Sequence, residues 1–324
     1  MKTNFTVTVI IPTFKRLDML SKALAGVYSI RKKPEQVVVV YRPEDDKETA
    51  KWLQNLNSSL YPNLILQSVF VPGQVAAMNA GLKASTNDIV VILDDDAIPK
   101  PDWLDIILEH FENPEVAAVG GRDIVHPHPQ VKEQIKAGYI DYWGNIIGNH
   151  HLVVGPAREV DALKGCNWAL RRSALGTLHF DERLLGKGAQ PGNDYWLCLN
   201  LRHFGWKIIL EPSAIVDHYP AVRLDHARDV WSKSKCFEQT RNEVAGRLAF
   251  YPWHLKLRFI LFHIFMGHRN CPGIYFIVHS LIKRPKSLIA QFTGGWAGFF
   301  AGWRAAKEFR ENPPGIPALP PAKK

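Results

Sequence analysis

Three consecutive aspartates, Asp94, Asp95 and Asp96, follow directly on the apolar run at residues 90–93. Such a run is typical of a buried parallel strand, and open α/β sheets bind their ligands beyond the carboxyl ends of the strands. Three adjacent carboxylates repel one another unless a cation joins them. Mg²⁺ or Mn²⁺ suits this position, because these ions bridge protein carboxylates to substrate phosphates. The pattern therefore predicts a metal-dependent site for a phosphorylated substrate.

The same acids could instead cap the next helix, because Pro101, Asp102 and Trp103 are typical of a helix start. A cap uses one aspartate, whereas this segment carries three. We therefore favour the functional interpretation.

Runs of β-branched residues alternate with segments of helical periodicity along the first part of the chain. This alternation predicts βαβ units around a mainly parallel sheet. The expected strands cover residues 7–11, 36–41, 64–69 and 88–93, and the expected helices cover residues 17–30, 47–56 and 75–83. Beyond Asp96 we expect strands at 116–121, 206–210 and 214–218, a helix at 194–204, and loops over the site at 122–160.

The positive charge of the chain lies in its last part. The net charge is +9; residues 202–324 hold 19 Lys and Arg against 8 Asp and Glu, whereas residues 1–201 hold 21 against 23. This asymmetry indicates a polyanionic partner, either nucleic acid or an anionic membrane surface. The four cysteines form no CxxC pair, which disfavours a zinc cluster and is typical of a reduced, cytosolic protein.

The sequence predicts three parts: a catalytic domain at 1–225, a basic and aromatic helical region at 226–311, and a disordered Pro-rich tail at 312–324. Basic and aromatic residues interleave in the helical region, as in helices that lie in a membrane interface. We therefore expect an anionic membrane surface as partner and no nucleic acid; packing against the enzyme or a second subunit is the alternative. Neither a signal peptide nor a transmembrane span is predicted, so we expect a cytoplasmic protein on the inner face of the cell membrane.

Seven segments, in their order and spacing, resemble the family-2 inverting glycosyltransferases of the GT-A fold. They are VIIPTFKR at 9–16, MNAGLKA at 78–84, LDDDAIP at 93–99, KGCNWALRR at 164–172, GNDYWL at 192–197, RHFGWKI at 202–208 and VDHYP at 216–220. The resemblance covers roughly residues 7–225. It implies a Rossmann-like α/β domain that moves a sugar from a nucleotide-diphosphate-sugar to a hydroxyl, with Mg²⁺ or Mn²⁺. Because the C-terminal region has the pattern of interfacial membrane helices, we expect the acceptor to be a glycan or a lipid-linked precursor in cell-surface polysaccharide or glycolipid synthesis.

The resemblance also implies which residues contact the donor and the metal. Asp94 would contact the ribose, Asp95 would add charge, and Asp96 would bind the metal, with His218 as a further metal or diphosphate ligand. Where relatives end the second strand in an Asp, this chain has Tyr-Arg-Pro-Glu-Asp at 41–45, which leaves Asp45 as the candidate. The remaining expected donor contacts are Pro12, Thr13, Arg16, Gln74, Asn79 and Arg223.

An inverting transfer needs one general base to take the proton from the attacking hydroxyl. The resemblance places this base at Asp194, at the start of the helix expected at 194–204, where an N-cap is the structural alternative. It also places Gly165, Asn167 and Trp168 beside the acceptor. Aromatic side chains stack on sugar faces, but they are equally ordinary core residues, and both interpretations stay open for Trp143, Trp168 and Trp196.

Two other functions compete with sugar transfer. A sugar nucleotidyltransferase normally has a glycine-rich basic loop after the first strand, whereas this chain has Pro-Thr-Phe-Lys-Arg at 12–16. A non-catalytic nucleotide- or nucleic-acid-binding protein would suit the basic C-terminal part. A non-catalytic function would leave the acids around Asp96 and Asp194 without a role.

Overall fold

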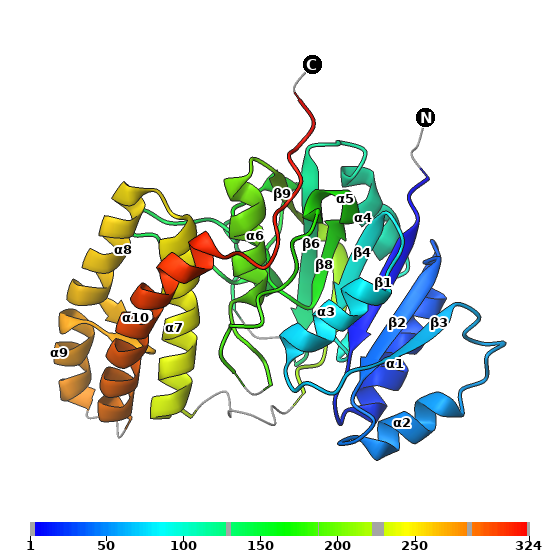
Figure 1. Ribbon diagram of the computed structural model, residues 1–324, viewed down its shortest axis with the longest axis horizontal. Coiled ribbons are helices and arrows are strands. Elements are labelled where there is room, and N and C mark those ends of the chain that lie inside the picture. The colour runs from blue at the N-terminus through cyan, green and yellow to red at the C-terminus, as the bar shows by residue number, and fades with distance from the viewer. Residues whose placement is uncertain (1–3, 128–130, 187, 222–229, 284–286, 323–324) are drawn as a thin grey trace.

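The computed structural model describes residues 4–127, 131–186, 188–221, 230–283 and 287–322 of the chain. Its central sheet contains β1 (Val7–Pro12), β2 (Gln36–Tyr41), β3 (Leu64–Ser68), β4 (Ile89–Leu93), β5 (Ala97–Pro99), β6 (Val116–Val125), β7 (Arg158–Glu159), β8 (Asn167–Arg171) and β9 (Lys207–His218). The strands lie in the order β3-β2-β1-β4-β8-β6-β9-β5, and β7 pairs with β9 (Figure 1). β1 to β4 pair in parallel, whereas β8 runs antiparallel to β4 and β6. The expected α/β architecture with a mainly parallel sheet is confirmed.

Helices cover both faces of this sheet because successive side chains of each strand point to opposite faces. In β1, Ile10 belongs to the core that includes Met78, whereas Val9 and Ile11 belong to the core that includes Leu20. The helices of this half are α1 (Leu17–Ser29), α2 (Lys47–Gln54), α3 (Gln74–Ala84), α4 (Trp103–His110), α5 (Arg172–Leu175) and α6 (Asn193–His203), with a 3₁₀ turn at His150–Leu152.

The strands near the end of the sheet are longer than the sequence predicts. The strands expected at 206–210 and 214–218 form one strand, β9, which bends at a bulge opposite Gly121 and Arg122 of β6. The bulge lets β6 continue to Val125, into a segment expected to be loop. This extension brings Asp123 to the same sheet edge as the acids after β4.

A second group of helices packs beside α6 and makes up the C-terminal part (Figure 1). It contains α7 (Lys233–Phe250), α8 (Trp253–Phe265), α9 (Ile274–Lys283) and α10 (Leu288–Glu311), with a short hairpin of β10 (Gly267–His268) and β11 (Cys271–Pro272). No helix within the described ranges combines the length and the apolar character needed to cross a membrane. The predicted boundary at residue 225 falls among residues 222–229, outside the described residues.

The closest helix contact in this part joins α10 to α7 through glycines spaced four residues apart. A Cβ atom added at Gly294, Gly298 or Gly302 would lie 2.3, 2.5 or 2.7 Å from a backbone oxygen of α7. Real Cβ atoms do not approach so closely, so only glycine permits this separation of the two helices.

The prediction of a disordered tail is wrong for the described residues 312–322. The tail returns to the catalytic half, where the backbone N–H of Thr177 donates to Ile316 O and that of Ala318 donates to Ala174 O. Trp206 Nε1 also donates to Ala318 O at 2.6 Å. Prolines hold the tail extended, and its carbonyls accept hydrogen bonds from the end of α5 and from the start of β9.

Replacing Gly298 by alanine should lower the free energy of unfolding by about 1–3 kcal/mol, because the added methyl group overpacks the contact with α7. Helix propensity alone would make the same change stabilising by about 1 kcal/mol, so the sign of the effect tests the contact. Thermal or urea unfolding of Gly298→Ala measures it. Ala297→Ser, at an exposed neighbour, is the control; a stabilised Gly298→Ala variant would contradict the packing.

Candidate functional site

Acidic side chains gather where β4, β6 and β9 end. Asp94, Asp95 and Asp96 follow β4, Asp123 lies near the end of β6, and His218 is the last residue of β9. Asp95 and Asp96 are only 2% and 5% exposed, respectively. Buried carboxylates in such number are costly, so each needs a cation or hydrogen-bond donors.

Asp95 is fully engaged in holding the loop after β1. Thr13 Oγ1 donates to Asp95 Oδ2 at 2.7 Å, and Arg16 Nη1 donates to Asp95 Oδ1 at 3.0 Å. Burial nevertheless raises the pKa of Asp95 to about 6, against the opposing effect of Arg16. Thr13, Arg16 and Asp95 therefore lie together, with Asp95 as the anchor between β1 and β4.

His218 lies between two carboxylates. Its Nδ1 is 3.1 Å from Asp123 Oδ2, and its Nε2 is 3.3 Å from Asp96 Oδ1. Burial opposes the charged imidazolium, but these two partners outweigh it and raise the pKa of His218 to about 9. Lys164 Nζ completes the group at 2.6 Å from Asp123 Oδ2. With these partners, and against the effect of burial, the pKa of Asp123 falls to about 2.

Asp94 and Asp96 have the properties of cation ligands. Asp96 Oδ1 is buried and accepts no hydrogen bond of good geometry, while Oδ2 accepts one from the Ala221 N–H at 2.9 Å. Burial, together with the charge of Asp96, raises the pKa of Asp94 to about 7. A divalent cation would give Asp96 Oδ1 a partner and would favour the charged form of Asp94. Asp123 holds the Nδ1 side of His218 and so points Nε2 at the same place, as carboxylates behind metal-binding histidines do.

Cys166 is a further candidate ligand, because its Sγ lies within 4.8 Å of ligand atoms of Asp94 and His218. Burial raises the pKa of this thiol well above its ordinary value. The thiol therefore stays protonated, and soft sulfur is a poor ligand for Mg²⁺ or Mn²⁺. The two carboxylates and His218 fit these hard cations better.

Asp194 lies in the first turn of α6 and faces the segment before β8. Its Oδ2 accepts a hydrogen bond from the Gly165 N–H at 2.7 Å, and its Oδ1 accepts one from the Tyr195 N–H at 2.8 Å. Burial raises the pKa of this half-buried carboxylate, and the two hydrogen bonds only partly offset that rise. Gly165 follows Lys164 directly, so the partners of Asp123 and of Asp194 are consecutive residues.

The other residues expected to contact the nucleotide-sugar donor lie in different surroundings. Pro12 ends β1, and Gln74 begins α3, both near the carboxyl ends of strands. Asp45 lies beyond β2, exposed, in an ion pair with Arg42. Asn79 is not available to the nucleotide-sugar donor, because its side chain is engaged by Phe180. Its Oδ1 accepts a hydrogen bond from the Phe180 N–H at 2.9 Å, and its Nδ2 donates one to Phe180 O at 3.0 Å. Arg223 lies outside the described residues.

Two of the three expected acceptor residues are structural instead. Asn167 is buried, donates to Arg122 O and Ala214 O, and accepts from Trp103 Nε1. Trp168 is fully buried in the sheet core beside Phe180. Successive side chains of β8 point to opposite faces of the sheet, and both faces are covered, so both side chains are buried. Of the three, only Gly165 lies against Asp194.

The tryptophans expected as stacking candidates divide between core and surface. Trp196 is buried and packs against Phe250 and Phe309. Trp143 is exposed and contacts Tyr142.

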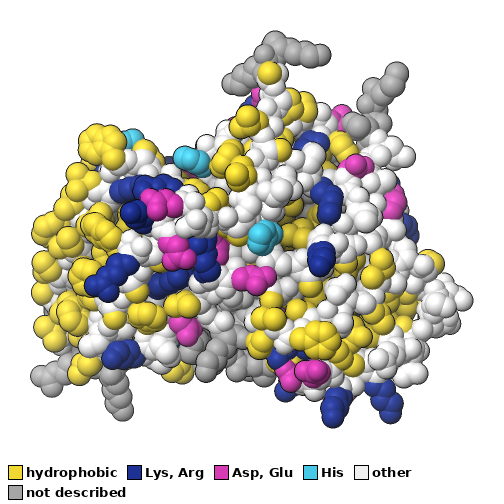
Figure 2. All heavy atoms as spheres, in the orientation of Figure 1, with side chains coloured by type: hydrophobic (Ala, Val, Ile, Leu, Met, Phe, Trp, Pro, Cys, Tyr) yellow, Lys and Arg dark blue, Asp and Glu magenta, His cyan; other side chains and the backbone are white. Residues whose placement is uncertain are grey.

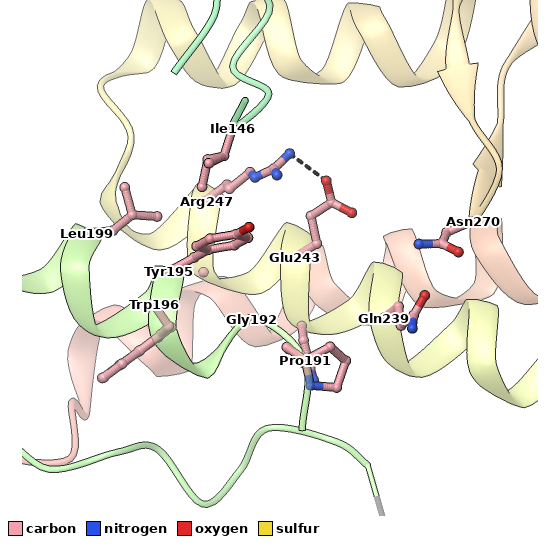
Figure 3. Close-up of a pocket in the computed structure, with 12 residues that line it drawn as sticks. Ile146, Pro191, Gly192, Tyr195, Trp196, Leu199, Gln239, Glu243, Arg247 and Asn270 are labelled. Atoms are coloured by element: carbon pink, nitrogen blue, oxygen red, sulfur yellow. Dashed lines mark hydrogen bonds and ion pairs between the residues drawn. The ribbon is translucent and has the colours of Figure 1, made fainter. Parts of the chain in front are cut away.

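A cavity of about 250 Å³ lies between α6 and α7 (Figure 3). Glu243 and Arg247 of α7 form an ion pair at 2.5 Å and point into it together with Tyr195. Asn270 Oδ1 is buried with no hydrogen-bond partner. The residues that line the cavity are Ile146, Pro191, Gly192, Tyr195, Trp196, Leu199, Gln239, Asn242, Glu243, Gly246, Arg247 and Asn270.

Several of these residues could not be found from the sequence. Asp123 lies in a segment expected to be loop, and Lys164 begins the segment KGCNWALRR without an expected role of its own; 41 positions separate the two residues. Glu243 and Arg247 have the spacing of an ordinary surface pair on a helix. Only the tertiary fold shows that each pair lies at a site.

Comparisons with known proteins agree with this geometry. Residues 4–236 match the model of the family described as glycosyltransferase like family 2. Over 169 residues, the chain is 31% identical to the pre-mycofactocin glycosyltransferase of Mycobacterium tuberculosis. That match covers 51% of this chain and 33% of the relative, so the chain spans about a third of that relative's length.

Two solved structures share the fold at low sequence identity. The mannosyltransferase PcManGT from Pyrobaculum calidifontis, in complex with GDP-Man and Mn²⁺, has a TM-score of 0.55 and 18% identity, over 95% of this chain and 87% of that one. S. aureus TarS in complex with UDP-GlcNAc has a TM-score of 0.58 and 14% identity, over 94% and 92%. The fold is therefore that of GT-A enzymes, and the chain belongs to glycosyltransferase family 2.

Proposed function

We propose that this glycosyltransferase moves a sugar from a nucleotide-diphosphate-sugar to a hydroxyl with inversion at the anomeric carbon. The observation that carries the proposal is the pairing of two carboxylate environments at one sheet edge. Asp94 and Asp96 lie beside His218 and are suited to a cation, whereas Asp194 lies in the first turn of α6 and accepts a hydrogen bond from the Gly165 N–H. One carboxylate group near the leaving diphosphate and one near the acceptor is what a displacement with a single base requires.

Asp94, Asp96 and His218 would hold Mg²⁺ or Mn²⁺. When bound, the ion neutralises the diphosphate that leaves. Arg16 lies 3.8 Å from Asp96 and adds a fixed positive charge at the same position. Asp194 takes the proton from the attacking hydroxyl, and its hydrogen bonds to Gly165 and Tyr195 orient the carboxylate for that transfer.

We place the acceptor in the cavity between α6 and α7. Gly192 and Tyr195 line this cavity and flank Asp194 in the same turn of chain. The cavity offers a carboxylate, a guanidinium, a phenol and an unpaired amide oxygen, which together suit the donors and acceptors of a sugar's hydroxyl groups. A glycan or lipid-linked acceptor, used in cell-surface polysaccharide or glycolipid synthesis, fits such a cavity.

Replacing Asp96 by asparagine should abolish the metal-dependent part of donor binding, because it removes a charged ligand from the cation site. The assay is a thermal shift with GDP-mannose and UDP-GlcNAc, with Mn²⁺ or EDTA, since a ligand of the native state raises the melting temperature by mass action. Asp102→Asn is a control six residues away, at a side chain that makes no capping hydrogen bond. An equal Mn²⁺-dependent shift in Asp96→Asn would refute the assignment.

Asp194→Asn should lower kcat by about 10²- to 10⁴-fold and leave donor binding unchanged, because only the general base is lost. Release of nucleoside diphosphate in the presence of acceptor measures kcat, and the thermal shift measures donor binding. Asp18→Asn makes the same change in the first turn of α1 and should leave both kcat and donor binding unchanged. Near-normal turnover by Asp194→Asn would rule out the base role.

The pH profile of kcat should show an acidic limb with a midpoint above 3.8, the ordinary pKa of an Asp, because burial raises the pKa of Asp194. A base works only when deprotonated, so activity is present above the raised pKa and is lost as the pH falls through it. Turnover measured from about pH 3 to about pH 9 tests this. A limb centred at or below the ordinary value would contradict the environment assigned to Asp194.

A further inference from the structure

The outer sides of α8, α9 and α10 carry a concentration of exposed large apolar side chains. Of the 25 such side chains among the described residues, 13 lie between residues 253 and 303. Trp253 and Ile289 are 77% and 78% exposed. The 13 are Trp253, Leu257, Ile264, Phe265, Met266, Ile274, Tyr275, Val278, Leu281, Ile289, Phe292, Phe300 and Trp303, and we call them the outer apolar face. Figure 2 shows hydrophobic side chains gathered over this end of the molecule.

This face is fixed in its outward orientation by packing on the inner sides of the same helices. Phe259 and His263 of α8 and Phe299 of α10 are buried in the contact with α7 and the β10–β11 hairpin. Trp253, Leu257 and Ile264 follow one another at spacings of four and seven residues, which is one side of a helix. The helices are therefore apolar on both sides: the inner side is buried against the protein, and the outer side is exposed.

The charge of the C-terminal helices indicates which kind of partner covers the outer apolar face. Residues 244–307 contain no Asp or Glu but nine Lys and Arg, which are Arg247, Lys256, Arg258, Arg269, Lys283, Arg284, Lys286, Arg304 and Lys307. Of these, Arg269, Arg304 and Lys307 are exposed. A symmetric contact with a second copy would set this basic part against itself, since a two-fold interface pairs each patch with its own copy. An anionic lipid surface satisfies both features, because it accepts apolar side chains and attracts Lys and Arg.

We propose that the outer apolar face docks the protein on an anionic bilayer surface, with its helices lying in the interface and the basic residues at the headgroups. Trp253, Tyr275 and Trp303 are the amphipathic aromatic residues that such a boundary favours. On the cytoplasmic side of a cell, this surface would be the inner face of the membrane. α7 stands between the docked helices and α6 (Figure 1).

The test is co-sedimentation of the full-length protein with vesicles, and it needs no substrate, so its outcome is independent of the proposed function. Vesicles of phosphatidylglycerol with phosphatidylcholine should pellet the protein, pure phosphatidylcholine should pellet much less, and about 0.5 M salt should weaken the binding. The triple variant Trp253→Ser, Phe265→Ser, Ile289→Ser should lower the partition coefficient at least about thirtyfold. Arg304→Gln with Lys307→Gln should lower it about twentyfold.

The control variant is Leu60→Ser with Phe70→Ser, which removes equally exposed apolar side chains from the catalytic half and should bind vesicles normally. Unchanged melting temperatures show that each variant is folded. Protein that stays in the supernatant with anionic vesicles at low salt, or a triple variant that pellets as well as the original, would overturn the proposal. So would a concentration-dependent dimer in light scattering that the triple variant abolishes, since a second copy would then cover the face.

Discussion

The arrangement of side chains at the carboxyl edge of the sheet depends on partners that neutralise the charges of its acids. A continuous series of contacts runs from Asp96 to His218, from His218 to Asp123, and from Asp123 to Lys164, whose neighbour Gly165 holds Asp194. Each member is buried or half-buried, so no member is stable without its partner. The series fixes the cation ligands and the base relative to one another. The bulge between β6 and β9 sets the register of this end of the sheet, in which Asp123 pairs with Val216 and Val125 pairs with His218.

The architecture of the first half could be predicted because its physical causes are local. β-branched runs alternate with helical patterns from β1 to β4, and three acids after a buried strand indicate a cation site without knowledge of the fold. The resemblance makes Asp194 the expected base, and the structure adds what the sequence lacks: hydrogen bonds from two backbone N–H groups, and a pKa raised by burial. Thr13, Arg16 and Asp95 likewise meet because β1 and β4 are neighbours.

The remaining features depend on contacts between distant segments, which a single sequence does not encode in any local pattern. Asn79 holds a loop because its side chain exchanges hydrogen bonds with the backbone of Phe180. Asn167 and Trp168 are both buried because β8 lies between β4 and β6 in a sheet that is covered on both faces. The Pro-rich tail has the composition of a disordered segment. It is ordered over its described residues because the end of α5 and Trp206 supply hydrogen-bond donors for its carbonyls.

The stereochemistry of the product tests the central claim most directly. A single displacement follows from the proposed roles, in which Asp194 is the base and lies apart from the acids proposed to hold the cation. A donor with an α-linked sugar, such as GDP-mannose or UDP-GlcNAc, should therefore give a β-linked product, which the anomeric proton signals in the NMR spectrum of the product identify. A β-linked product is the result that this arrangement predicts. An α-linked product would mean retention and would contradict the role of Asp194 as the base of a one-step transfer.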